Sequence, residues 1–141
     1  MSDVSTFRLY VLRATYLLLA VGLAIDIWPL ILNHPPDVEH LRGVVRSILG
    51  TVALLALLGI RYPLKMLPLM FFELVWKTIW VLGFGLPLLR AHELTPDTRE
   101  TMKACLMGVI IIPIVIPWPY VWRQYVKAPA DRWRKNTAIR Q

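Results

Sequence analysis

The chain has 141 residues, of which 57% are hydrophobic and 18% are charged, and its formal net charge at pH 7 is +7. The mean hydropathy of +0.54 excludes an ordinary soluble domain built around one core and is typical of a membrane protein. The single cysteine, Cys105, excludes an intramolecular disulfide and a CxxC metal or redox motif.

Four apolar runs are each close to the roughly 20 residues that a helix needs to cross hydrocarbon. They span residues 9–32, 44–60, 64–89 and 102–122. The sequence therefore predicts an all-α fold, an integral membrane four-helix bundle with short loops. We expect one domain over residues 1–141, ending in a basic tail at 123–141.

The first run, 9–32, follows Arg8 and Arg13, as the core of a secretion signal would. It is longer than the 7 to 15 apolar residues of such a core, so we interpret it as a membrane helix. Asp26 lies in its outer half, about 8 Å from its middle. It is either an interfacial residue or a group that reaches toward Lys77 from a neighbouring helix.

The second run carries small residues that allow close approach of another helix backbone. Gly43, Ser47 and Thr51 recur every four residues, with Gly50 and Ala53 alongside. We expect helix packing here.

The third run contains MFFELVWKTIW at residues 70–80, which places Glu73 and Lys77 near the middle of a predicted span. The four-residue spacing puts both side chains on one helix face, which Trp76 and Trp80 share. A lysine that faces lipid costs about 2.5 to 3.5 kcal/mol, so this face should point into protein. The pair is either a structural ion pair that fixes helix rotation or a site for a ligand, ion or proton.

The fourth run reads GVIIIPIVIPWPYVW, and its three prolines predict helix kinks. Pro113 removes the usual donor to the Val109 carbonyl. Pro117 and Pro119 do the same for the carbonyls of Pro113 and Val115. Freed carbonyls at membrane depth need protein, polar side chains or a water-lined cavity beside them.

Basic residues set the predicted orientation, since short basic segments stay in the cytoplasm. The side that holds both termini carries ten Lys and Arg residues, and the opposite side carries five. Both termini should therefore be cytoplasmic. The tail VWRQYVKAPADRWRKN is a topology signal or a segment that binds anionic headgroups, and its charge does not require nucleic acid.

All three histidines of the chain fall in the loops predicted on the outer side. His34, His40 and His92 have carboxylates nearby, a chemistry that suits zinc, but no recognised spacing. We treat them as weak metal candidates and predict no metal and no cofactor.

The segments RYPLKMLPLMFFELVWKTIW and IPWPYVWRQYVKAPADRW resemble a family of small uncharacterised four-helix inner-membrane proteins of bacteria. The resemblance implies a bacterial inner-membrane location and no particular activity. In size the bundle is also similar to DoxX-like proteins and to sterol-isomerase-type membrane domains.

Three functions fit these features. The first is a module, in a homo-oligomer, that binds or transports an amphipathic solute or a proton at Glu73 and Lys77. The second is an accessory subunit whose charged face docks another membrane protein. The third, ranked last, is a membrane enzyme for a lipid-like substrate that uses Glu73 or Asp26 as acid or base, with Trp76 and Trp80 shaping the pocket.

Overall fold

The computed structural model describes residues 4–134, which are helical and contain no β-strand. Residues 135–141 of the predicted basic tail lie outside that range. The elements in chain order are α1 (Thr6–Asp26), α2 (Trp28–Leu32), α3 (His40–Arg61), α4 (Leu67–Trp80), the π-helix η1 (Val81–Gly85), α5 (Leu86–Arg90), α6 (Pro96–Val115), α7 (Trp118–Val121) and the π-helix η2 (Trp122–Lys127).

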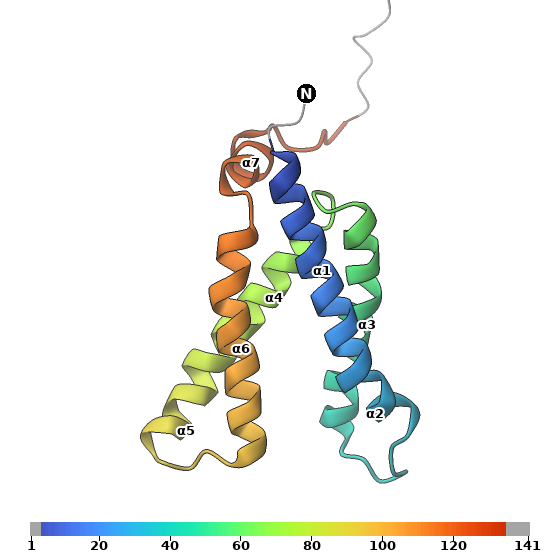
Figure 1. Ribbon diagram of the computed structural model, residues 1–141, viewed down its shortest axis with the longest axis vertical. Helices are drawn as coiled ribbons and strands as arrows, with labels where there is room; N and C mark the ends of the chain where they lie inside the picture. The colour runs from blue at the N-terminus through green and yellow to red at the C-terminus, as the bar shows by residue number, and fades with distance from the viewer. Residues whose placement is uncertain (1–3, 135–141) are drawn as a thin grey trace, which may run out of the picture.

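The helices form two antiparallel pairs, α1 with α3 and α4 with α6 (Figure 1). The pairs meet in a core that all four helices supply, with Leu12 of α1, Ala56 of α3, Met70 of α4 and Ile112 of α6 among its members. Away from that core, α1 and α6 spread apart in Figure 1 while α4 crosses behind them.

Three helical stretches are long and apolar enough to cross a membrane: Thr6–Leu32, His40–Arg61 and Leu67–Arg90. A fourth is added if Pro96–Val115 and Trp118–Lys127, which meet at a bend of 74°, count as one span. Large apolar side chains cover the outer surface of the described residues, as a lipid-facing surface requires. The fold is thus all-helical and compatible with a multi-pass membrane protein.

Of the small residues predicted to pack the second helix, Gly50 and Ala53 are buried, whereas Ser47 and Thr51 are not. Ser47 and Thr51 are exposed, and their hydroxyls donate to the carbonyls four residues earlier, at 2.9 Å each. The buried row includes Gly50, Ala53 and Gly59. A Cβ at Gly59 would overlap the Tyr16 ring, whose hydroxyl donates to the Pro63 carbonyl at 2.9 Å.

The fourth predicted run, residues 102–122, forms two helical segments and not one continuous helix. Helix α6 begins earlier, at Pro96, where the Thr95 hydroxyl caps it, and it ends at Val115. Pro117 and Pro119 cannot donate the backbone hydrogen bonds that would continue it, so the chain turns by 74° before α7. Similarly, the first run breaks at Ile27, just ahead of Pro29.

Candidate functional site

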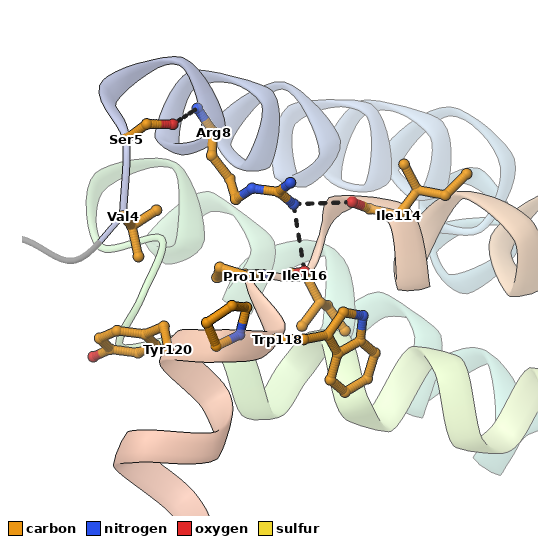
Figure 2. A pocket seen from close by; sticks show the side chains of 9 residues that line it. Val4, Ser5, Arg8, Ile114, Ile116, Pro117, Trp118 and Tyr120 are labelled. Carbon is orange, nitrogen blue, oxygen red and sulfur yellow. Dashed lines mark hydrogen bonds between the residues drawn. The ribbon is translucent and has the colours of Figure 1, made fainter.

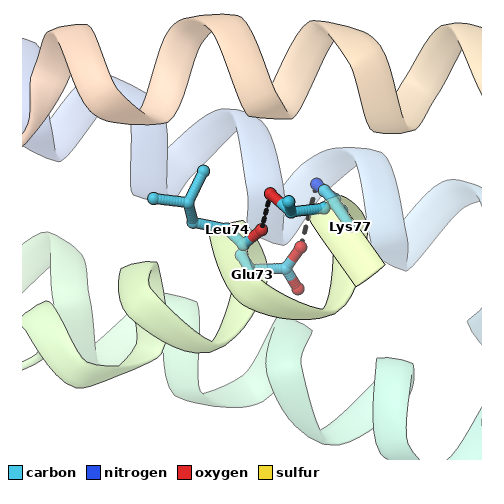
Figure 3. Close-up of polar contacts among 4 residues, drawn as sticks. Glu73, Leu74 and Lys77 are labelled. Carbon is cyan, nitrogen blue, oxygen red and sulfur yellow. Dashed lines mark hydrogen bonds and ion pairs between the residues drawn. The ribbon is translucent and has the colours of Figure 1, made fainter. Parts of the chain in front are cut away.

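Glu73 and Lys77 lie one turn apart on α4, with the lysine Nζ 2.8 Å from Glu73 Oε2 (Figure 3). The glutamate side chain is 1% exposed and the lysine side chain 13% exposed. Both charges are thus enclosed, and each is the nearest counter-charge of the other. A pair in this geometry offsets part of the desolvation cost that either charge would carry alone.

Gly108 of α6 provides the space for the lysine. A Cβ at this position would lie 2.7 Å from Lys77 Cδ and 2.9 Å from Nζ. The lysine stem therefore passes directly over the α6 backbone, where the Cβ of any other residue would require the lysine side chain to shift. Sequence reasoning missed Gly108, because only the docking of α4 on α6 relates the two positions.

Two polar atoms beside the pair are buried and have no hydrogen-bond partner among the described residues. They are the second carboxylate oxygen of Glu73, Oε1, and the indole nitrogen of Trp76, Nε1. Each costs about 1–3 kcal/mol when left unpaired. One is an acceptor and the other a donor, so α4 carries unused hydrogen-bonding capacity of both kinds next to the ion pair.

A hollow of about 260 Å³ lies between α1, α4 and α6, and Lys77 lines it. Its walls are mostly apolar, with Leu18 and Leu23 on α1 and Met107 on α6. Its polar lining includes Thr15 and Asp26 of α1 as well as the lysine. The hollow thus combines apolar walls with a cation, which is the arrangement of a site for an amphipathic molecule.

Asp26 lines the same hollow as Lys77, so the structure brings the two predicted residues to one space. Its side chain is exposed at the end of α1. Within residues 4–134, the ion pair of Lys77 is with Glu73, and none joins it to Asp26.

Trp76 and Trp80 do not line the hollow. Both pack against a second small core of Val81, Met102 and Cys105, and Lys77 Nζ lies 5.7 Å from the Trp76 ring centroid. Of the two indoles, Trp76 thus lies close to the lysine charge, while both pack against the second core and not against the hollow.

The predicted proline effects occur at the end of α6. Pro117 has no N–H to donate to the Pro113 carbonyl, which instead accepts a hydrogen bond from Trp118 Nε1 at 2.7 Å. Pro119 likewise has none for the Val115 carbonyl, which accepts a hydrogen bond from Arg8 Nη1 at 3.1 Å. Both partners are side chains that sequence reasoning did not assign to this role.

The weak metal candidates lie in two separate loops. His34 and His40 flank the α2–α3 connection, and His92 lies between α5 and α6. Among the described residues, no group of three His, Cys, Asp or Glu is arranged to hold a metal ion.

No protein-family model, curated protein or solved structure matches this chain.

Proposed function

We propose that the chain is a multi-pass protein of the bacterial inner membrane, a four-helix bundle with both termini in the cytoplasm. The start of α1 and the segment that follows α6 lie at the same end of the molecule, as an even number of spans requires (Figure 1). The excess of Lys and Arg at that end supports a cytoplasmic location.

Its proposed function is to bind, and in a homo-oligomer to transport, an amphipathic anion in the hollow between α1 and α6. The observation that carries this proposal is that Lys77 lies against a mostly apolar hollow of about 260 Å³. An ammonium group has three donors, and one is directed at Glu73. A carboxylate or phosphate group at the head of an acyl chain could accept another, while the chain contacts the leucines and methionines.

Glu73 has a separate part in this proposal. Its carboxylate supplies the counter-charge that keeps the enclosed lysine tolerable, and its second oxygen, Oε1, has no hydrogen-bond partner among the described residues.

The accessory-subunit alternative is less favoured. Glu73 is 1% exposed within a single chain, so no partner is needed to cover the pair. The enzyme alternative lacks a second group placed to act with Glu73, since Asp26 lies exposed at the end of α1.

Binding of the fluorescent fatty acid cis-parinaric acid to detergent-purified protein tests the proposal. Lys77→Met should weaken binding by about tenfold or more, because a charge-assisted hydrogen bond is lost. The matched control is Lys103→Met on the exposed surface of α6, which should bind as the parent protein does. Equal binding by K77M and the parent protein would overturn the proposal.

A second pair of variants tests the walls without touching the charges. Leu18→Trp should fill the hollow and reduce binding, whereas Leu17→Trp, one residue earlier and outside the lining, should not. Both leucines are at least half exposed, so neither variant disturbs the core.

A further inference from the structure

Arg8 lies at the end of the molecule where α1 begins and α6 stops. Its Nη1 lies 3.0 Å from the Ile114 carbonyl oxygen, 3.1 Å from that of Val115 and 3.4 Å from that of Ile116 (Figure 2). These carbonyls belong to the last turn of α6 and to the residue after it, where helix geometry leaves acceptors unpaired. The arginine thus caps a helix that lies 106 to 108 residues away along the chain.

The cap leaves the arginine charge without a full counter-charge. Carbonyl groups and the negative end of a helix dipole supply only partial charge. Within residues 4–134, the carboxylates in ion pairs are Glu73 and Glu100, and neither pairs with Arg8. The described hydrogen bonds of the guanidinium all use Nη1, so Nε and Nη2 remain as donors.

A hollow of about 360 Å³ opens beside this guanidinium. Its lining includes Ser5, the N-cap of α1, and Arg8 of α1, together with Ile114, Trp118 and Tyr120 (Figure 2). The chain bends by 74° here, between Pro96–Val115 and Trp118–Lys127. Tryptophan and tyrosine, which line this hollow, are enriched at the level of the lipid headgroups.

We propose that this hollow binds the phosphate group of an anionic phospholipid, with Arg8 as the ligand to the phosphate. A guanidinium fork matches phosphate oxygens, and the apolar Ile114 and Trp118 suit the glycerol and first acyl carbons. Inorganic phosphate offers the same oxygens without those carbons. The apolar walls therefore favour a phospholipid over inorganic phosphate as the source of the phosphate group. The site is independent of the function proposed for Lys77.

The test titrates detergent-purified protein with dioleoyl phosphatidylglycerol and counts bound lipid by native mass spectrometry. One lipid should bind in preference to phosphatidylcholine, and Arg8→Gln should weaken that binding by about tenfold. Arg13→Gln is the matched control. Arg13 also lies on α1 and donates to a carbonyl of another helix, that of Ile60 at 2.9 Å, but it is outside the hollow.

A second pair of variants keeps the test decisive if Arg8→Gln fails to fold. Ser5→Trp places a large side chain in the hollow while leaving the arginine and the backbone carbonyls of α6 in place, and should also weaken phosphatidylglycerol binding. Ser5→Ala is its control, since it loses the same N-cap hydrogen bond without filling the hollow, and should bind as the parent protein does. Unchanged binding by S5W and R8Q would overturn the site. Displacement of the lipid by millimolar inorganic phosphate would overturn the lipid as its occupant.

Discussion

Lys77 and Arg8 are both cations held against α6, yet the protein satisfies them in different ways. Lys77 lies over the middle of α6 at Gly108, and a carboxylate 2.8 Å away neutralises it. Arg8 lies at the end of α6, and backbone carbonyls satisfy its hydrogen bonds without neutralising its charge.

This difference follows from depth in the proposed membrane. A charge near the middle of a span lies far from water and headgroups, so it needs a counter-charge within the protein. A charge near the end of a span can draw on solvent or lipid phosphate, so hydrogen bonds suffice. Breaking the interaction of each cation should therefore lower the free energy of unfolding most at Lys77 and least at the arginines that cap helix ends.

The largest effect is expected for Glu73→Gln, which leaves the buried ammonium without its counter-charge. Breaking a buried pair in this way costs about 3–5 kcal/mol of unfolding free energy. Chemical unfolding of the detergent-purified protein measures it.

The double variant Glu73→Leu, Lys77→Met removes both charges and should be less destabilised than E73Q alone. The single variants E73L and K77M complete the comparison. If the double variant lost as much unfolding free energy as the two single variants added together, a direct interaction between the two side chains would be contradicted.

A smaller effect is expected for Gly108→Ala. Its new Cβ would lie 2.7 Å from Lys77 Cδ, so the lysine or α6 must shift, at a cost of about 1–3 kcal/mol. Gly43→Ala is the control, since a Cβ there meets no atom within 4 Å. It should stabilise α3 by about 0.5–1 kcal/mol through the lower entropy of the unfolded chain. Equal effects of the two substitutions would show that the lysine does not cross α6 at Gly108.

The smallest effect is expected for the helix caps. Arg13→Gln loses one hydrogen bond, to the Ile60 carbonyl, and should lower the unfolding free energy by about 0.5–1.5 kcal/mol. Arg8→Gln should lower it somewhat more, because three carbonyls share its Nη1. The same unfolding assay compares the R13Q and R8Q variants. If either variant lost as much unfolding free energy as E73Q, the expectation that these caps contribute less than the Glu73–Lys77 ion pair would be wrong.

The features that could be predicted from the sequence depend on residues close together along the chain. The four-residue spacing placed Glu73 and Lys77 on one face of one helix, and proline chemistry identified the carbonyls of Pro113 and Val115 as freed. Their partners were not predictable. Trp118 donates to the Pro113 carbonyl across the bend, and Arg8 comes from the other end of the chain.

The packing of the second predicted helix shows the same limit. The sequence contains two interleaved rows of small residues, one through Gly43 and Ser47 and one through Gly50 and Ala53. Either would allow close approach of a helix. Tyr16 of α1 takes the space over Gly59, and Trp28 and Ile31 of α2 take the space over Gly50. The docking of α1 and α2, which the sequence did not predict, therefore determines that the second row is buried.

In the proposed function, Lys77 binds the anionic head of a ligand in the hollow between α1 and α6. A crystal structure of the protein with a terminally brominated fatty acid would show where that ligand lies, because bromine gives an anomalous signal that locates the acyl chain. We expect the carboxylate at Lys77 and the bromine between α1 and α6. Bromine peaks confined to the outer, lipid-facing surface, with Lys77 still bound to Glu73 alone, would contradict it.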